Sequence, residues 1–370
     1  MPEMKPPEVK PSKPWMIYGA NGYTGELAAR EAAARGLRPV LAGRNAAAVG
    51  ALALELGFDS RSFSLDDAAD PEAARRGIEG MSAVLHCAGP FVRTSKPMVE
   101  ACLAAGAHYL DITGEIAVFE PILSRRGEDA RRAGVALLPG VGFDVVPSDC
   151  LAARLAAALP DATELVLAFA SDRGGLSRGT LKTMIESLPA TGAVRRGGKI
   201  VPVPIAFDAR EIDFGGKLGE RWTMTIPWGD VSTAFHSTGI PNIRVYTGTP
   251  PSTIRRARFL APFLPLAGLK PVKRFLQSRV DRRAPGPSAE ARATGRTYLW
   301  GEVKNAAGAV VTATLETPEA YRLTAVSAVE CARRAADGRV PPGAWTPSKA
   351  FGADYVTELE GVVAGPVVRR

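Results

Sequence analysis

The sequence has few of the residues that build metal and disulfide sites. Its 370 residues include three histidines and four cysteines, and the cysteines show no C-x-x-C spacing. A zinc site of the usual ligand spacing is therefore not expected, and we predict that the functional site holds no metal. Each cysteine falls inside an apolar stretch, which is typical of small buried side chains in a reducing compartment.

Long hydrophobic runs are also lacking. No stretch reaches 18 apolar residues, so we expect no membrane-spanning helix. Residues 1–14 are rich in Pro and Lys, lack the apolar region of a signal peptide, and are expected to form a disordered tail. These absences predict a cytoplasmic protein. The net charge of +8 suits an anionic cofactor and acyl or phosphorylated substrates, and we expect no nucleic-acid partner.

Three glycines near the start of the chain are its most informative feature. Gly19, Gly22 and Gly25 follow a short apolar run and precede a helix-forming stretch. At a strand-to-helix junction such glycines let the backbone approach a pyrophosphate, and the helix N-terminus offers free N–H groups to it. The pattern therefore predicts a dinucleotide-binding turn.

The position expected to meet the adenosine ribose is basic. An NAD site usually has Asp or Glu at the end of the second strand, about 20 residues beyond the glycines, whereas this chain has Arg44 and Asn45. A guanidinium binds a 2′-phosphate bidentately, so the sequence favours NADP(H) over NAD(H). An alternative is that Arg44 merely precedes a helix that Asn45 caps.

Strand-like and helix-like runs alternate through the first 150 residues. Short strands that are apolar on both faces are typical of a covered parallel sheet, so we predict an α/β, doubly wound Rossmann-type domain. The expected strands are 15–19, 39–43, 61–64, 82–87, 108–112 and 135–138. The expected helices are 24–35, 46–57, 71–78, 96–105 and 117–133.

Beyond residue 150 the chain becomes strand-rich, which predicts a second, mixed α+β domain with a largely antiparallel sheet. Its expected strands are 163–170, 199–207, 220–226, 243–247, 296–303 and 308–315, and its expected helices are 178–188, 253–278 and 318–336. A further helix, capped by Ser148 or Asp149 and running to about Leu159, is expected at the junction of the two domains. The expected division of the chain is a tail at 1–14, a dinucleotide-binding domain at 15–150, a substrate or dimerisation domain at 151–316, and a C-terminal helix and tail at 317–370 that packs back on the first domain.

One segment of the second domain is amphipathic. Residues 254–276 interleave Phe and Leu with Arg and Lys. Such a segment can lie on a membrane surface or cover an apolar ligand. The alternative is a proline-broken helical hairpin whose apolar face belongs to the core.

Several motifs together resemble a known family. They are Gly19–Gly25, Ala42–Arg44, Cys87–Phe91, Ala105–Glu115 and Gly142–Asp149. In these the chain is similar to the saccharopine dehydrogenase-like oxidoreductases, a group that includes trans-acting enoyl reductases of actinobacterial lipid synthesis. The resemblance is close over residues 15 to about 150 and looser beyond.

The resemblance implies a set of site residues. The residues expected to contact the cofactor are Gly19, Ala20, Asn21, Gly22, Tyr23, Thr24, Gly25, Arg44, Asn45, Cys87, Ala88, Gly89, Pro90 and Phe91. It also implies that Asp111, Glu115 and Asp144 crowd the nicotinamide end of the cleft.

Hydride transfer usually needs a proton donor as well. No tyrosine has a lysine four residues later, so the pair used by short-chain dehydrogenases is absent. The catalytic candidates are Tyr109, Asp111, Asp144 and His236, and burial would raise the pKa of the two carboxyls. The alternative is that Asp111 and Asp144 brace their own loops.

Three functions fit these observations. The first is an NADP(H)-dependent reductase of a C=C bond in an acyl or polyketide-type intermediate. The second acts on a C–N bond of an amino acid adduct, which requires arginines to hold carboxylates, with candidates at Arg173, Arg178, Arg195 and Arg196. The third is a cofactor-binding protein without turnover at a lipid surface. A homodimer and peripheral lipid contact through 254–276 are further expectations.

Overall fold

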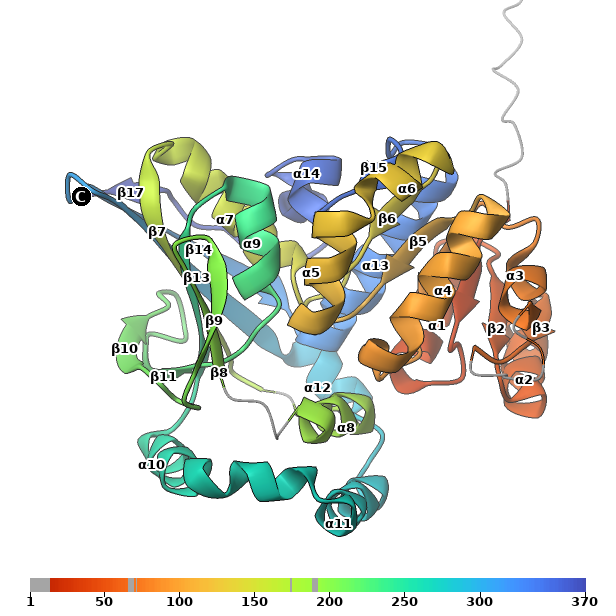
Figure 1. The fold of residues 1–370 in the computed structure, drawn as a ribbon, viewed down its shortest axis with the longest axis horizontal. Helices are drawn as coiled ribbons and strands as arrows, with labels where there is room; N and C mark the ends of the chain where they lie inside the picture. Colours follow the sequence, from red (N-terminus) through yellow and green to blue (C-terminus); the bar gives the residue numbers. More distant parts are fainter. Residues whose placement is uncertain (1–13, 66–69, 71, 174, 188–191) are drawn as a thin grey trace, which may run out of the picture.

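The computed structural model describes residues 14–65, 70, 72–173, 175–187 and 192–370, with the backbone alone at 265–268. Two β-sheets lie side by side, each with helices against it (Figure 1). The predicted fold class is confirmed, because a parallel, helix-covered sheet is followed by a separate mixed sheet.

The first sheet has the strand order β15-β6-β5-β4-β1-β2-β3, and all of its pairs are parallel. Its strands are β1 (Met16–Tyr18), β2 (Val40–Gly43), β3 (Ser60–Ser62), β4 (Ala83–His86), β5 (His108–Asp111), β6 (Ala136–Leu138) and β15 (Gly343–Ala344). The order reverses between β1 and β4, so ligands are expected beyond the carboxyl ends of these two strands.

Alternation along the strands separates two apolar layers. Leu41, Ile17, Leu85 and Leu110 pair in register, are fully buried, and face the layer shared with the second sheet. Their neighbours along each strand point to the opposite face, where a second cluster includes Met98. Burial on both faces explains why these strands are apolar throughout.

The first sheet is covered by six helices formed by the first half of the chain. They are α1 (Tyr23–Ala34), α2 (Ala46–Leu56), α3 (Ala73–Ile78), α4 (Phe91–Ala105), α5 (Ile116–Arg125) and α6 (Gly127–Arg132). Two predictions were wrong here. α4 begins five residues before its expected start, with Pro97 inside it, and the expected helix 117–133 is divided in two near Arg126.

The second sheet is mixed. Its main path is β10-β11-β12-β7-β13-β14-β16, and every pair along it is antiparallel except β12 with β7. Its strands are β7 (Ala162–Ser171), β8 (Gly192–Arg196), β9 (Lys199–Val203), β10 (Ala209–Asp213), β11 (Glu220–Thr225), β12 (Asn242–Gly248), β13 (Arg296–Asn305), β14 (Val310–Pro318), β16 (Val363–Ala364) and β17 (Val368–Arg369). The sequence pattern missed β8 and β10.

The remaining helices connect and cover this sheet. They are α7 (Val146–Ala158), α8 (Arg178–Ser187), α9 (Asp230–Thr238), α10 (Pro251–Leu260), η1 (Ala261–Gly268), α11 (Lys270–Asp281), α12 (Ala289–Thr294), α13 (Ala320–Ala336), α14 (Pro347–Phe351) and η2 (Tyr355–Glu358). The pattern missed α9, α12, α14 and η2, and the helix expected at 253–278 is divided into α10, η1 and α11. No helix in the described ranges is both long and apolar enough to cross a bilayer.

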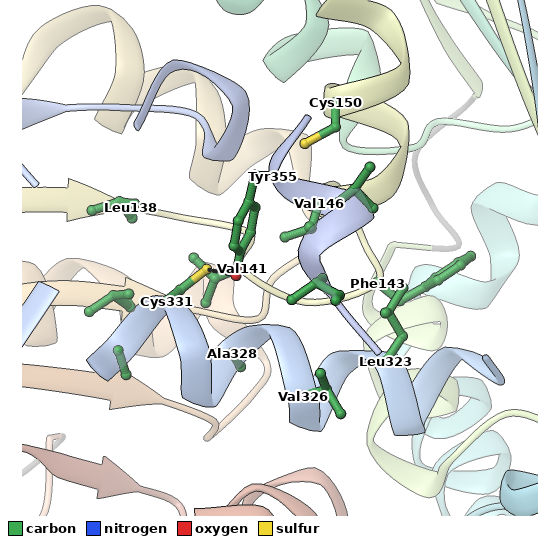
Figure 2. Packing of buried hydrophobic residues seen from close by; sticks show 14 of the residues in the cluster. Leu138, Val141, Phe143, Val146, Cys150, Leu323, Val326, Ala328, Cys331 and Tyr355 are labelled. Atoms are coloured by element: carbon green, nitrogen blue, oxygen red, sulfur yellow. Dashed lines mark hydrogen bonds between the residues drawn. The ribbon is translucent and has the colours of Figure 1, made fainter. Parts of the chain in front are cut away.

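Helix α13 joins the two halves of the molecule. It packs against α1 and against strands β4 and β5 of the first sheet, while β14 leads into it from the second sheet. Figure 2 shows Leu323, Val326 and Cys331 of α13 among buried residues of the loop after β6 and of η2. One continuous apolar cluster therefore spans both sheets.

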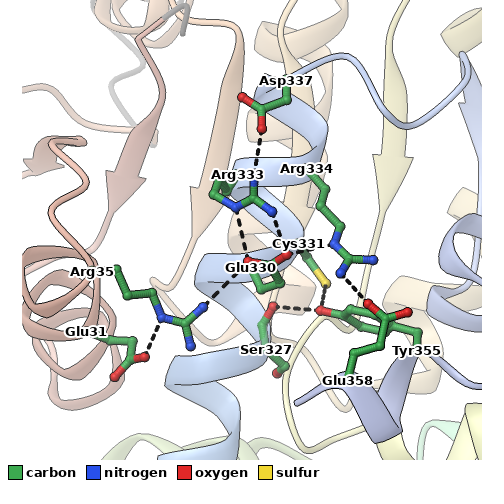
Figure 3. Close-up of polar contacts among 10 residues, drawn as sticks. All are labelled: Glu31, Arg35, Ser327, Glu330, Cys331, Arg333, Arg334, Asp337, Tyr355 and Glu358. Atoms are coloured by element: carbon green, nitrogen blue, oxygen red, sulfur yellow. Dashed lines mark hydrogen bonds and ion pairs between the residues drawn. The ribbon is translucent and has the colours of Figure 1, made fainter. Parts of the chain in front are cut away.

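The C-terminal end of α13 carries a polar network (Figure 3). Arg333 and Arg334 both bond to the carboxylate of Glu330, at 2.7 and 2.8 Å, and Arg35 of α1 lies 3.5 Å from it. Burial alone would raise the pKa of Glu330, but the arginines outweigh it and the pKa is lowered. Arg334 also bonds to Glu358 of η2 at 2.6 Å, so this network ties α1, α13 and η2 together.

Candidate cofactor and substrate site

The glycine turn between β1 and α1 admits no side chain at two of its positions. Gly19 has φ +83°, and a Cβ atom placed there would lie 2.9 Å from the Cβ of Ala88. A Cβ atom at Gly25 would lie 2.2 Å from the carbonyl oxygen of Gly19. Gly22 is less constrained, with a contact of 3.2 Å to the same oxygen. The first and third glycines are thus required for the turn and for the approach of the β4 loop.

The start of α1 fits an anionic group. Its N-cap is Gly22, and in the described part of the chain no side chain caps this end. The first N–H groups of a helix have no intrahelical acceptor and lie at the positive end of its dipole. The residues present therefore suit the pyrophosphate of a dinucleotide.

The end of β2 lies against the same turn. A Cβ atom at Gly43 would lie 3.2 Å from the side-chain oxygen of Asn21, so Arg44 follows directly beside the glycine turn. Arg44 is exposed. The Asn45 side chain accepts the Ala48 N–H at 3.1 Å, which makes it the N-cap of α2. A contact between Arg44 and a 2′-phosphate stays a prediction from the sequence.

The loop from Cys87 to Phe91 is held in place by Glu115. The two Glu115 carboxylate oxygens accept the N–H groups of Phe91 and Val92, each at 2.9 Å, and so cap α4 from the loop after β5. This tertiary cap explains why α4 begins before its expected start. Burial raises the pKa of Glu115 against the lowering effect of these bonds. Burial and the nearby Asp111 raise the pKa of the Cys87 thiol to about 12, so it is not a reactive thiolate.

Tyr109 and Asp111 form a buried brace. The Tyr109 hydroxyl donates to Asp111 at 2.5 Å, and the other Asp111 oxygen accepts the N–H groups of Thr113 and Gly140 at 3.1 and 2.8 Å. Both side chains are fully buried. Burial raises the pKa of Asp111 to about 6 despite these bonds. Every carboxylate oxygen of Asp111 is therefore engaged in holding the loops after β5 and β6.

Asp144 differs from Asp111 in having no partner. Its side chain is half-buried and makes no hydrogen bond or ion pair to the described residues. A Cβ atom at Gly114 would lie 2.7 Å from the Asp144 Oδ2 atom, so a side chain at position 114 would occupy the space that this carboxylate needs. Burial raises the pKa of Asp144 to about 7. Gly114 precedes Glu115, which places Asp144 beside the loops that follow β4 and β5.

The backbone around Asp144 is strained and held from outside. Val145 has φ 112°, which is a rare conformation for a β-branched residue and costs on the order of 1–3 kcal/mol. Thr324 of α13 accepts the Phe143 N–H at 3.0 Å, and Ser327 donates to the Val141 carbonyl at 2.8 Å. Strain of this kind is concentrated at functional sites, because the surrounding structure must impose it.

A second buried acid, Asp230, was missed by the sequence analysis. It begins α9, is fully buried, and accepts the Ser148 hydroxyl at 2.9 Å, while its Oδ1 finds no partner among the described residues. Burial, with the charges of Asp149 and Asp144 nearby, raises the pKa of Asp230 to about 8. The only sequence signal was the turn-like pair Gly229-Asp230 before the helix that the pattern also missed.

The structure places His236 apart from this group. It lies in the last turn of α9, 3.5 Å from Glu120 of α5, whereas Asp230 is at the opposite end of that helix. Burial would raise the pKa of Glu120, but His236, Ser232 and Arg195 lower it to about 2. Among the described residues no group of three His, Cys, Asp or Glu side chains is arranged to hold a metal ion.

Tyr23, expected beside the cofactor, contacts the second domain. Its hydroxyl donates to the Pro287 carbonyl at 2.7 Å and accepts from Arg292 at 2.9 Å, and its ring packs edge-on against Tyr321 at 5.2 Å. The Tyr321 hydroxyl in turn accepts the Ser177 N–H at 2.7 Å. The first turn of α1 is thus connected to the segment that leads into α8.

Comparisons with known proteins show what the first domain and the fold resemble. Residues 15–138 match the family model of the saccharopine dehydrogenase NADP-binding domain. A Mycobacterium tuberculosis protein named as a trans-acting enoyl reductase is 32% identical over an aligned length of 185 residues, and the match covers 47% of this chain and 43% of that protein. A trans-acting enoyl reductase of Mycobacterium bovis is 32% identical over 138 residues, 36% of this chain and 33% of that protein. The matches thus span less than half the length of these relatives.

The whole fold also has a solved counterpart. The apo saccharopine dehydrogenase (L-Glu forming) of Saccharomyces cerevisiae superimposes with a TM-score of 0.65, covering 96% of this chain and 100% of that one at 12% identity. This likeness shows the fold. The family match confirms the resemblance and the prediction of NADP(H) as the cofactor. Residues 15–138 are therefore similar to the NADP-binding domain of the saccharopine dehydrogenases.

Proposed function

We propose that the protein is an NADP(H)-dependent oxidoreductase that reduces the C=C bond of an acyl or polyketide-type intermediate, either free or held on a carrier. The matched NADP-binding domain and the relatives named as trans-acting enoyl reductases support this proposal. The observation that carries it is the unpartnered, half-buried Asp144 carboxylate on a strained loop beside the expected nicotinamide end of the site.

The reaction divides between the cofactor and the chain. The glycine turn and Arg44 would hold NADPH, which would supply a hydride to one carbon of the double bond. Asp144 would donate a proton from a carboxyl oxygen to the other carbon, which balances the reduction. A pKa of about 7 suits this task, because a substantial fraction of the carboxyl holds its proton at neutral pH. Glu115 and Asp111 hold the surrounding loops, and Asp230 adds a second acid nearby.

The amino acid alternative requires arginines that share a pocket, and three of the four candidate arginines already contact other groups of the chain. Arg195 is 2% exposed and bonds to the Val231 and Gly198 carbonyls and to Glu120. Arg178 lies on α8 and reaches the Asp281 carbonyl at 3.4 Å. Arg196 is exposed and packs over Phe207. These contacts favour acyl over multiply charged amino acid substrates.

The test is NADPH oxidation by the purified protein with two substrate classes, enoyl thioesters of increasing chain length and imine adducts of amino acids. We expect turnover of enoyl thioesters. In Asp144→Asn we expect kcat to fall by a factor of about a hundred or more with unchanged NADPH affinity, because proton donation contributes on the order of 10²–10⁴ in rate.

His236→Asn is the matched control, since it replaces the other expected donor and should retain turnover if Asp144 is the acid. Turnover of imine adducts alone would refute reduction of a C=C bond and would support the alternative reaction at a C–N bond. NADPH binding without turnover of either class would leave a cofactor-binding protein with no reaction.

A further inference from the structure

The segment formed by α10, η1 and α11 stands out from the rest of the molecule. Figure 1 shows it as a bar that runs below the second sheet and α8, with its ends joined to the body. We name residues 251–283 the basic arm. Its contacts to α8 are polar: Lys273 and Gln277 both reach Glu186, and Lys182 bonds to Asp281 at 2.6 Å. The arm is thus anchored along one side.

The basic arm carries a charge equal to that of the whole protein. It holds nine Lys and Arg residues and one Asp, a formal charge of +8, which is also the net charge of the 370-residue chain. The other parts of the sequence are therefore neutral overall. Eight of the nine cationic side chains are exposed. They are Arg255, Arg256, Arg258, Lys270, Arg274, Arg279, Arg282 and Arg283.

Large apolar side chains are exposed among these charges. Phe259 is 74% exposed, Phe263 55% and Phe275 57%. Leu260, Leu269 and Val272 are exposed as well. Aromatic and aliphatic groups of this size, gathered on one segment and surrounded by cations, are unusual on a surface that faces only water.

The two kinds of side chain occupy the same faces of the helices. On α10, Phe259 lies one turn from Arg255, and Leu260 one turn from Arg256. On α11 the guanidinium of Arg279 lies 5.2 Å from the centre of the Phe275 ring, and Val272 precedes that phenylalanine by three residues. If these apolar side chains entered a surface, the neighbouring Arg and Lys side chains would lie at the depth of any anionic groups on that surface.

We propose that the basic arm is a docking surface for an anionic lipid bilayer, on which it lies flat with its phenylalanines in the headgroup and acyl boundary. Exposed apolar groups with flanking Lys and Arg are the combination that binds such interfaces. Charge complementarity identifies the occupant. A second copy of the arm would bring another +8 against the first, which disfavours self-association through this face.

An acidic carrier protein would satisfy the arginines and lysines. Such a protein would bury fewer of the three phenylalanines, which are spread over α10, η1 and α11, whereas a bilayer can bury all of them along its plane. The membrane surface therefore accounts for both observations. The proposal does not depend on the reaction, because none of its residues belongs to the cofactor or Asp144 site.

The experiment is co-sedimentation of the full chain with vesicles of phosphatidylcholine alone and of phosphatidylcholine with one-third phosphatidylglycerol. We expect binding to the anionic vesicles, at least tenfold weaker binding to the neutral ones, and weakening of the former at high salt. The triple variant Phe259→Ser, Phe263→Ser, Phe275→Ser should bind anionic vesicles at least tenfold more weakly. The matched control is Leu54→Ser with Val363→Ser, which removes exposed apolar groups elsewhere and should bind like the parent.

NADPH binding is measured for every variant, so that loss of the fold is recognised separately from loss of docking. Absence of binding to anionic vesicles by the NADPH-binding parent would overturn the proposal. Equal binding to both vesicle types, or equal loss in the control, would also overturn it. So would a parent dimer that the triple variant converts to monomers, or binding of an acidic acyl-carrier protein in place of vesicles.

Discussion

Replacement of Asp144 by Asn should make the protein more stable at neutral pH. The pKa of this carboxyl rises from an ordinary 3.8 to about 7 through burial, so the fold penalises its charged form. The effect of this carboxyl on the free energy of unfolding therefore depends on pH. Below about pH 4 the group is protonated in both the folded and the unfolded chain and costs nothing. Between pH 4 and 7 the unfolded chain loses its proton first, and the penalty grows until it is complete above pH 7.

The magnitude follows from the size of the shift. About three pH units at about 1.4 kcal/mol each set a ceiling of about 4 kcal/mol on the free energy of unfolding. Because the side chain is half-buried, water relieves part of this cost, and we expect Asp144→Asn to gain about 1–2 kcal/mol at pH 8. At pH 4 the gain should vanish.

Urea unfolding at pH 4 and pH 8 measures this difference, with Asp59→Asn as a control at an exposed aspartate. The same variant should lose turnover. In the parent, kcat should fall about tenfold per unit above pH 7, as the protonated fraction of Asp144 falls. A variant that is less stable at pH 8 and turns over normally would show that Asp144 braces its loop, and would refute the reasoning.

Further predictions concern the glycine turn, the ribose site and the α13 network. Gly25→Ala should abolish NADPH binding in a fluorescence titration, since its Cβ would lie 2.2 Å from the carbonyl oxygen of Gly19. The control is Gly50→Ala in α2, which has open space around it, and this variant should bind NADPH normally and unfold at a slightly higher temperature. Arg44→Ala should weaken NADPH about tenfold or more and leave NADH unchanged; equal losses for both would remove the 2′-phosphate role. Glu330→Gln should lower the free energy of unfolding by about 1 kcal/mol at pH 7, where the paired carboxylate is charged. The difference should shrink progressively as the pH falls below 4.5, the ordinary pKa of the group, and a difference that stays constant would contradict the ion-pair explanation.

Local hydrophobic patterns in the sequence were sufficient to predict most strands of the first sheet. The ends of strands β1 to β6 were predicted to within two residues, because burial on both faces makes most of these strands continuous apolar runs and turn residues separate them from the helices. Where tertiary contacts set a boundary, the pattern failed. The start of α4 depends on a carboxylate 24 residues away, at Glu115, and the start of α7 at Val146 follows a strained Val145 instead of a capping side chain.

The sequence pattern predicted fewer of the strands and helices of the second domain. Strands β8 and β10 are short and partly exposed, so a period of two does not mark them clearly. Helix α9 is short and buries polar residues such as Ser232 and Thr233, so its buried face is not an apolar stripe with a helical period. Their positions are decided by partners distant in the chain. Arg195 of β8, for example, is buried through contacts with α5 and α9, which no local pattern of its strand encodes.

For the site, the sequence by itself determined the glycine turn, the basic residue after β2 and a set of acidic candidates, because backbone space and charge at those positions are local properties. Only the tertiary structure separated the acids. The carboxylate oxygens of Asp111 all accept hydrogen bonds from Tyr109 or from backbone N–H groups. Asp144 has no partner among the residues that the structure describes, and it lies on a strained loop that α13 holds in place. A carboxyl's role depends on its desolvation and its partners, and these are set by segments far apart in the chain.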